Sequence, residues 1–592
     1  MRNPFRRDLI LLHAPALYDF RTRPTFLGPV ADAVPSTAIF EMYPVGLTSI
    51  ASYLERNHYN VEIVNVAYRM LRDPGYDVDA HIRRLSAPVF GIDLHWLPHV
   101  QGALALAERV KALHPDSRIL MGGLSASYYH EELVRYPFVD FVIRGDSTEE
   151  PVRQLLQALR EGRPLDKVEN LTWKRDGRTA TVNPLTFVPA DLDYVDVPAY
   201  GYLMRSMFKY HSLRNLVPHL EWLRYPITLL LTARGCTQDC AVCGGSRSAY
   251  RHICNRPAPA YRSPEKLVED VRTIETFSRA PIFMVHDPRM GGMRRAERLF
   301  ALLEAERPAN EIIFELYAPA DDRFFAMVQR SLPAWSVEMT LEAPDEALRR
   351  RNGKFACSNA QVEQTIESAL AHGCGKVDVF FMVGLPHQTY DAALRIADYC
   401  EHLIVRFGAG GRVRPYVAPL APFLDPGSRA FEHPEPGCTT FCRTLEDHRQ
   451  ACLQGGWQRV LSYATADMTR DQIASATYEV AARLNAIKHR HGLIDDRTYE
   501  GVACRLGVAR EVLREDGPLD ARRIDLANHA TMFGDDELKS PGHRGFRVGT
   551  ALCLSLAAGL AHELVHTAAR LAGRYDVAVT AATLAPGRSH AG

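Results

Sequence analysis

Short apolar runs alternate with amphipathic stretches from residue 8 to about residue 165. Most positions within each run are apolar, which is typical of strands buried on both faces of a sheet. These runs are 9–14, 61–67, 88–94, 118–123 and 139–146. The stretches at 46–59 and 102–114 instead repeat apolar positions every three or four residues, as amphipathic helices do. The alternation predicts an α/β fold with a doubly wound, Rossmann-like sheet over residues 1–165.

Ligands bind to a doubly wound sheet beyond the carboxyl ends of its strands. The candidate binding residues of the first domain are therefore those that follow each run. They are Arg69, His95, Gly122, Gly123 and Gly145. A ligand that bears phosphate suits this edge. Residues 166–225 contain several spaced prolines, which predict a connector to which no fold is assigned.

A second alternation of the same kind begins at residue 227. Its apolar runs are 227–236, 281–288, 311–317, 335–344, 376–386 and 412–420. Helical stretches such as 263–277 and 361–373 lie between them. Six βα units in series predict a partial (β/α)6 barrel over residues 226–425, with its active site at the carboxyl ends of the strands. Residues 426–592 show helical periodicity without strands, and we expect this region to close over the barrel mouth.

Composition and charge narrow the classes of function. With 592 residues, of which 46% are apolar, the chain is long enough for several folded domains. Seventy basic and seventy acidic residues cancel, so no net charge draws the protein to nucleic acid or a membrane surface, and a small-molecule substrate is expected. The first apolar run is too short for a signal peptide, and the late stretch 549–573 predicts a buried helix that is too short to span a bilayer. Twelve cysteines without an export signal indicate thiols in the reducing cytoplasm.

Three cysteines crowd into eight positions directly after the first run of the second alternation. Cys236, Cys240 and Cys243 have the spacing CxxxCxxC, in which each thiolate can bind one iron of a four-iron cluster and leave the fourth iron open. A structural zinc site is the alternative, but it usually needs four ligands, and Cys254 is the only spare cysteine nearby. The other nine cysteines are interpreted as ordinary buried residues, with metal binding by the CTTFC pair at 438–442 left as an alternative.

The cysteine loop resembles that of the radical S-adenosylmethionine (SAM) superfamily, in which it follows the first strand of a partial (β/α)6 barrel. The resemblance implies that SAM binds the open iron. It makes Asp287 of VHDP the counterpart of the residue that receives the methionine amine, with His286 in place of a glycine. Val242 stands where the family usually has an aromatic residue. Glu342 of MTLEAP resembles a contact near the ribose, with a helix-capping or surface carboxylate as the alternative, and Gly384 of MVGLP resembles a turn near adenine.

The first domain resembles the cobalamin-binding domain of the cobalamin-dependent class within that superfamily. The glycines of MGGLSAS let the backbone approach the nucleotide tail of cobalamin, and Ser125 and Ser127 are placed to bond its phosphate or ribose. Many cobalamin domains carry DxHxxG after the first strand, and this chain does not. We therefore predict no protein ligand below cobalt and place Arg69 there as a catalytic residue, with an ordinary surface arginine as the alternative. His95 of DLHWLP is the alternative axial ligand, or it lines the tail pocket.

The combined resemblance covers about residues 8–425 and implies a methyltransferase. SAM would methylate Co(I), and methylcobalamin would pass the methyl group to an unreactive carbon. The domain order, the missing histidine motif and the segment NVAYRM most resemble the enzymes that methylate C2 of the L-tryptophan indole for the quinaldic acid of thiostrepton-type antibiotics. An external reductant is then implied. Two alternatives remain: another cobalamin radical SAM enzyme, which acts on an sp3 carbon or rearranges a ring through a deoxyadenosyl radical, and a noncatalytic corrinoid or iron–sulfur carrier.

Overall fold

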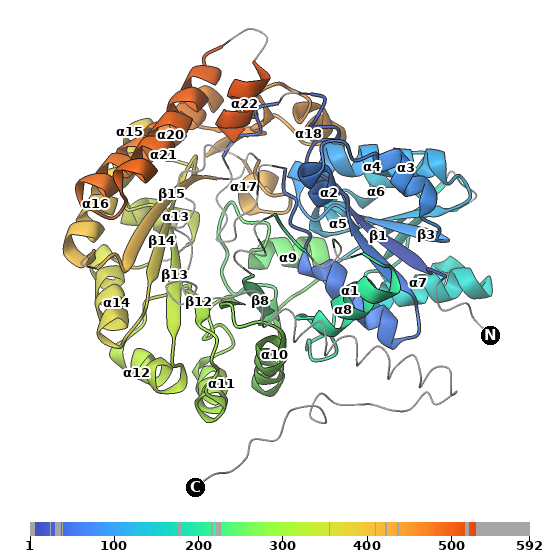
Figure 1. The fold of residues 1–592 in the computed structure, drawn as a ribbon, viewed down its shortest axis with the longest axis horizontal. Coiled ribbons are helices and arrows are strands. Elements are labelled where there is room, and N and C mark those ends of the chain that lie inside the picture. The colour runs from blue at the N-terminus through green and yellow to red at the C-terminus, as the bar shows by residue number, and fades with distance from the viewer. Residues whose placement is uncertain are drawn as a thin grey trace.

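The computed structural model describes residues 6–528, apart from short gaps. The gaps are residues 24, 30–36, 38, 176, 178, 213, 215–216, 221, 223–225, 355, 409, 421–422, 435–436 and 516–519. The late apolar stretch at 549–573 lies outside the described residues. Figure 1 shows an N-terminal α/β domain beside a barrel-like α/β domain, with the C-terminal helices along the barrel's outer edge. In the described part of the chain, no helix is both long and apolar enough to cross a membrane.

The N-terminal sheet has seven strands in the order β2-β1-β3-β4-β5-β6-β7. They are β1 (Leu9–His13), β2 (Val61–Asn65), β3 (Val89–Asp93), β4 (Arg118–Gly122), β5 (Phe141–Ile143), β6 (Leu171–Arg175) and β7 (Thr179–Val182). Strands β1 to β5 run parallel, and β6 and β7 add an antiparallel edge. The strand order reverses between β1 and β3, so the predicted doubly wound fold is confirmed and its ligand-binding crevice lies at the ends of these two strands.

Helices cover both faces of this sheet. They are α1 (Val45–Arg56), α2 (Val66–Arg72), α3 (Val78–Arg84), α4 (Val100–Leu113), α5 (Leu124–Tyr128), α6 (His130–Leu133), α7 (Glu149–Glu161) and α8 (Tyr200–Lys209), with short 3-10 turns η1 (Leu97–His99) and η2 (Leu165–Lys167). Two separate apolar clusters line the two faces, since neighbouring strand residues such as Leu9 and Ile10 point to opposite sides. Strands β6 and β7 and helix α8 lie in the expected connector, so that segment completes the first domain.

The second sheet has six parallel strands in the order β15-β14-β13-β12-β11-β8. They are β8 (Thr228–Leu231), β11 (Ile282–Val285), β12 (Ile312–Leu316), β13 (Trp335–Glu342), β14 (Val377–Val383) and β15 (Val413–Pro419). The outer helices are α10 (Pro264–Phe277), α11 (Met293–Glu306), α12 (Asp322–Ser331), α13 (Glu346–Asn352), α14 (Asn359–Ala371), α15 (Tyr390–Leu394) and α16 (Ile396–Phe407). Strands β8 and β15 do not pair with each other, so the predicted partial barrel is confirmed.

Several barrel helices start at residues whose side chains cap them. Ser263 accepts a hydrogen bond from Lys266 N ahead of Pro264 in the first turn of α10, and Ser358 and Gln361 form a capping box at α14. Such caps bond backbone N–H groups that have no partner within the helix, so the chain leaves each strand and enters each helix at a defined residue.

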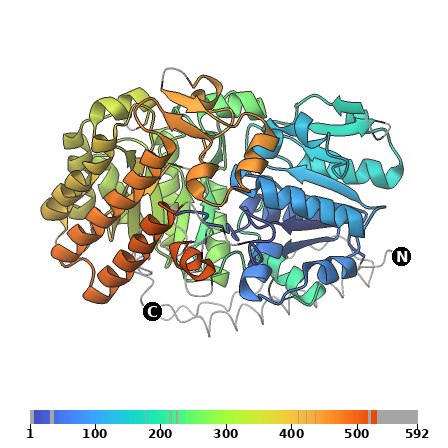
Figure 2. The ribbon, with the colours of Figure 1, turned by 90° about the horizontal axis from the view of Figure 1, so that it is seen from above.

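The C-terminal region contains a small two-stranded antiparallel sheet, β16–β17, as well as the predicted helices. Its elements are α17 (Arg429–Glu432), β16 (Cys438–Thr440), α18 (Leu445–Ala451), α19 (Trp457–Val460), β17 (Tyr463–Thr465), α20 (Arg470–Arg490), α21 (Asp496–Val512) and α22 (Ala521–Asn528). Strands of three residues are too short to produce a visible alternation, which explains why the sequence did not predict them. Val480 and Leu484 of α20 belong to the barrel core, so this region is part of the barrel's packing. Figure 2 shows the chain around residue 440, in orange, reaching from the barrel to the N-terminal domain.

Candidate active site

The three cysteines of the CxxxCxxC segment lie on one loop beyond the carboxyl end of β8. Cys236 Sγ accepts a hydrogen bond from Gln238 N at 3.3 Å, and Cys243 Sγ accepts one from Gly245 N at 3.2 Å. Such N–H donors stabilise a thiolate. Burial raises the pKa of the Cys240 thiol to about 11, so without a metal this thiol keeps its proton at neutral pH. Within the described residues, no group of three His, Cys, Asp or Glu side chains is placed to bind one metal ion. A four-iron cluster does not require such a group, because each thiolate binds a different iron.

Lys354 faces the cysteine loop and was not found by sequence reasoning. Ala241 N donates to Asn352 O at 2.7 Å, and Cys240 Sγ lies 3.9 Å from Gly353 O, so the 352–354 segment is bound against the loop. The Lys354 ammonium lies 4.9 Å from the centre of the Tyr317 ring. Burial alone would lower the pKa of Lys354, but Cys240 in its thiolate form and the carboxylates of Glu342 and Glu315 raise it. The ammonium is therefore a fixed positive charge beside the thiols, contributed by a loop more than a hundred residues away in sequence.

Strand ends beside the cysteine loop hold strained and polar residues. His286 and Glu342 have φ values of 77° and 66°, a region that residues other than glycine rarely adopt. Burial raises the pKa of Glu342 to about 7 against the opposing effect of Lys354, and its Oε2 has no hydrogen-bond partner among the described residues. The Asp287 carboxylate accepts from Arg289 at 2.7 and 2.9 Å and from Tyr317 N at 2.9 Å. Asp287 is thus already bonded, whereas Glu342 has an oxygen available.

The turn after β14 is held from two sides. Gly384 has a φ of 96°, its N–H donates to Gln388 Oε1 at 2.8 Å, and Tyr463 Oη donates to its carbonyl at 3.0 Å. A Cβ at Gly384 would lie 2.6 Å from Tyr463 Oη, so only glycine fits the turn. Tyr463 starts β17, which places the small β16–β17 sheet against the barrel mouth and agrees in part with the expectation that the C-terminal region closes it.

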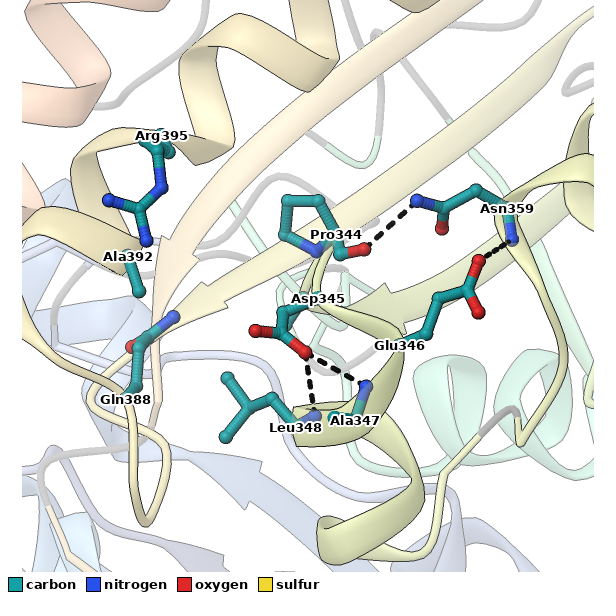
Figure 3. A pocket seen from close by; sticks show the side chains of 10 residues that line it. Pro344, Asp345, Glu346, Ala347, Leu348, Asn359, Gln388, Ala392 and Arg395 are labelled. Carbon is teal, nitrogen blue, oxygen red and sulfur yellow. Dashed lines mark hydrogen bonds between the residues drawn. The ribbon is translucent and has the colours of Figure 1, made fainter.

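A cavity of about 360 Å³ lies beside the same turn, between α13 and α15 (Figure 3). Asp345 accepts hydrogen bonds from Ala347 N and Leu348 N and so caps α13, and Asn359 Nδ2 donates to Pro344 O. These polar groups are engaged in holding the backbone. The cavity therefore lies next to the candidate active site without adding groups to it.

Histidines gather where β1 and β3 end, in the crevice of the N-terminal sheet. The buried Asp93 carboxylate accepts from His95 Nδ1 at 2.7 Å and from His13 Nδ1 at 3.0 Å. His13 Nε2 lies 2.9 Å from Phe40 O, so both of its nitrogens face acceptors. Burial alone would lower the pKa of His13, but Asp93 outweighs it and the pKa is raised.

The predicted glycines and serines after β4 and β5 lie beside these histidines. Gly123 has a φ of 119°, and a Cβ there would lie 2.5 Å from His95 Cα, so the close approach requires glycine. Ser127 Oγ donates to Gly123 O at 2.7 Å and accepts from Gly145 N at 2.9 Å. Ser125 Oγ lies 3.5 Å from His95 O. Ser125, Ser127 and the half-buried Gly122 therefore lie along the same edge of the sheet. Ser127 holds the two loops together with its own hydrogen bonds.

Arg69 follows β2 on helix α2, one strand away from the histidines. Its Nη2 donates to Ser212 Oγ at 2.8 Å, and burial lowers its pKa. Ser212 lies just beyond α8, so the segment expected to be a connector contacts the candidate catalytic arginine. Sequence reasoning placed Arg69 at the strand edge but did not identify this partner.

Asp425 joins the two candidate sites. Its Oδ1 accepts from Trp96 Nε1 at 3.1 Å, and its Oδ2 accepts from Gly244 N at 2.9 Å. Trp96 directly follows His95, and Gly244 directly follows Cys243. One carboxylate, of a partly buried residue, therefore links the histidine edge of the N-terminal domain to the cysteine loop of the barrel.

Two family models match the chain over these two regions. The model of the B12 binding domain matches residues 32–155, and that of the Radical SAM superfamily matches residues 230–400. This chain joins a B12-binding domain to a radical SAM domain. Its cofactors are cobalamin, a [4Fe–4S] cluster and SAM, as predicted from the sequence. The three thiols are a donor set that fits such a cluster, and the glycine-lined crevice beside His95 suits the close approach of a nucleotide tail.

Known relatives include methyltransferases. The chain is 24% identical to the uncharacterized methyltransferase PH0819 of Pyrococcus horikoshii over 204 residues, 34% of this chain and 40% of the relative. It is 23% identical to the cytidylyl-2-hydroxyethylphosphonate methyltransferase of Streptomyces wedmorensis over 390 residues, 58% of this chain and 69% of the relative. The match thus spans less than half the length of the Pyrococcus protein.

The fold is similar to that of a solved radical SAM methyltransferase. TsrM from Kitasatospora setae, with tryptophan substrate and the SAM analogue aza-SAM bound, aligns with a TM-score of 0.54 and 15% identity. The alignment covers 83% of this chain and 90% of TsrM. At this identity the match shows a shared fold alone. The chain thus matches a B12-binding domain followed by a radical SAM domain, and the relatives that match part of it include methyltransferases.

Proposed function

We propose that the protein is a cobalamin- and SAM-dependent C-methyltransferase that methylates C2 of the indole of L-tryptophan in quinaldic acid biosynthesis for thiostrepton-type antibiotics. The observation that carries methyl transfer is the direct link through Asp425 between the cysteine loop and the edge of the B12-binding domain. This link brings a methyl donor bound at the cluster close to the cobalamin crevice. When bound, cobalamin supplies a strongly nucleophilic cobalt that can carry a methyl group to carbon.

Residues of this chain provide the rest of the proposed site. Lys354 offers a positive charge to a ligand carboxylate, and Glu342, whose pKa is about 7, can accept a proton near neutral pH. Tyr463 and the β16–β17 sheet cover the turn at Gly384, which reduces access of water to the barrel mouth. L-tryptophan is supported by the fold shared with TsrM, which was solved with that substrate.

Product analysis tests this function. The protein loaded with both cofactors and an external reductant should convert L-tryptophan and SAM to 2-methyltryptophan and S-adenosylhomocysteine, without 5′-deoxyadenosine. One 5′-deoxyadenosine per turnover would favour the radical alternative. Methylation of other indoles but not of tryptophan would contradict the substrate assignment, and methyl uptake by cobalamin alone would indicate a carrier.

The lower face of cobalt gives a second prediction. We expect the electron paramagnetic resonance (EPR) spectrum of the Co(II) form to lack nitrogen splitting, because DxHxxG is absent and an always-protonated guanidinium such as that of Arg69 cannot ligate. A fixed positive charge near cobalt favours the lower-charged metal left after methyl transfer, so Arg69→Leu should slow transfer about tenfold. Splitting that disappears in His95→Ala would instead make His95 the axial ligand.

A further inference from the structure

Two arginines on either side of the cysteine loop reach the junction between β5 and α7 of the B12-binding domain. Arg234, two residues before Cys236, donates to Glu149 Oε1 at 2.6 Å and Oε2 at 3.1 Å. Arg256, two residues beyond α9 (Arg247–Cys254), pairs with Asp146 through Nε and through Nη2 at 2.9 Å. Asp146 and Glu149 both belong to residues 145–150, which follow β5 at the cobalamin edge.

These four side chains are almost completely removed from water. The exposed fractions are 10% and 1% for the Arg234–Glu149 pair and 2% and 6% for the Arg256–Asp146 pair. Glu149 also accepts from Ser49 Oγ at 2.6 Å, and both arginines reach Ser147 Oγ, at 3.1 and 3.2 Å. Burial alone would lower the pKa of Arg234, but Glu149 outweighs it and raises the pKa.

Buried pairs of this geometry specify one arrangement. A guanidinium that bonds both oxygens of a carboxylate tolerates little change in distance or angle. Each pair, once separated, would leave uncompensated charges in a dry interface, which is strongly unfavourable. Because the pairs lie on both flanks of the cysteine loop, they oppose both rotation and separation of the two domains.

We propose that Arg234 and Arg256 are positioning residues that hold the B12-binding domain in one docked orientation and so set the separation between cobalt and the iron–sulfur cluster. Methyl transfer would then take place between docked domains, without a swing of the B12-binding domain. The importance of this separation rests on the proposed function, but the docking itself does not.

Pulsed EPR on the fully loaded protein tests the proposal, because Co(II) and the reduced cluster are both paramagnetic and their dipolar interaction reports their separation. The wild type should give one narrow distribution of distances. Arg256→Met and Glu149→Gln should each broaden it at least twofold and lower kcat about tenfold, with the Kd for SAM changed less than twofold. Glu149→Gln keeps the size of the side chain, so a folding failure of Arg256→Met leaves the test intact.

Lys376→Met is the matched control. Lys376 forms an equally buried ion pair with Asp378 of β14, and both residues belong to the barrel sheet rather than to the contact between the domains. Its loss should lower the melting temperature and keep the narrow distribution. Distributions in Arg256→Met and Glu149→Gln as narrow as in the wild type would overturn the proposal. Broadening in a protein that methylates no substrate would uphold the docking role and reject the proposed function.

Discussion

Replacing Cys236, Cys240 and Cys243 together with alanine is expected to remove the cluster completely and abolish methyl transfer, while cobalamin still binds. The three thiols are the protein ligands assigned to the cluster, and they lie on one loop of the barrel. The cobalamin crevice lies in a different domain with its own sheet and its own two apolar clusters, so its fold does not depend on these thiols. Iron and sulfide content, the visible absorbance of the cluster and cobalamin retention on gel filtration would measure the result.

Two control variants separate this assignment from its alternatives. Cys504→Ala changes an exposed cysteine of α21 and should retain the full iron content. Cys438→Ala with Cys442→Ala removes the CTTFC pair, two buried cysteines at the start of β16 and just beyond its end, and this variant should also retain the full iron content. A full cluster in the triple variant, or its loss in the CTTFC variant, would show that other residues bind the iron.

Lys354→Met is expected to make the cluster harder to reduce by roughly 100 mV. The reduced cluster carries one more negative charge than the oxidised cluster, so a nearby cation stabilises the reduced form. At about 6 Å and an effective dielectric constant of about 20, Coulomb's law gives roughly 3 kcal/mol, a hundredfold change in the equilibrium. For a one-electron reduction, each tenfold change in the equilibrium constant corresponds to about 59 mV in the midpoint potential. Screening by solvent lowers the resulting shift to the roughly 100 mV expected. An EPR-monitored redox titration would measure the midpoint potential.

Lys354→Arg keeps the positive charge and should keep the midpoint potential within about 30 mV of the wild type, half of a tenfold step on a logarithmic scale. Unchanged iron content in both variants would show that the shift arises from charge and not from a damaged site. If Lys354→Met and the wild type had the same midpoint potential, the Lys354 ammonium would have no electrostatic effect on the cluster. The carboxylates of Glu315 and Glu342, which also face Lys354, would then be its main partners.

Local sequence patterns were sufficient for the domain order and for the main strands of both sheets. Buried parallel strands are nearly continuous apolar runs, and each of the predicted runs contains a strand of the structure. The six residues of the β16–β17 sheet were missed, because strands this short carry no periodicity. Ser127 was expected to bond cobalamin, and that role stays a prediction; the structure adds that its hydroxyl already joins Gly123 to Gly145.

The sequence by itself determined the chemistry that depends on neighbours along the chain: the CxxxCxxC thiols, the glycines after β4 and the two domains whose cofactors are cobalamin, the cluster and SAM. Only the tertiary structure decided which residues from distant parts of the chain contact the cysteine loop and the edge of the B12-binding domain. Lys354 lies 111 residues beyond Cys243, Asp425 binds Gly244 from 181 residues away, and Arg256 reaches Asp146 across 110 residues. No periodicity or spacing encodes such pairs, because each arises where two separately folded surfaces pack and exclude water. Charges and polar groups buried there must find partners on the opposing surface, and only the packed fold shows which partner each one has.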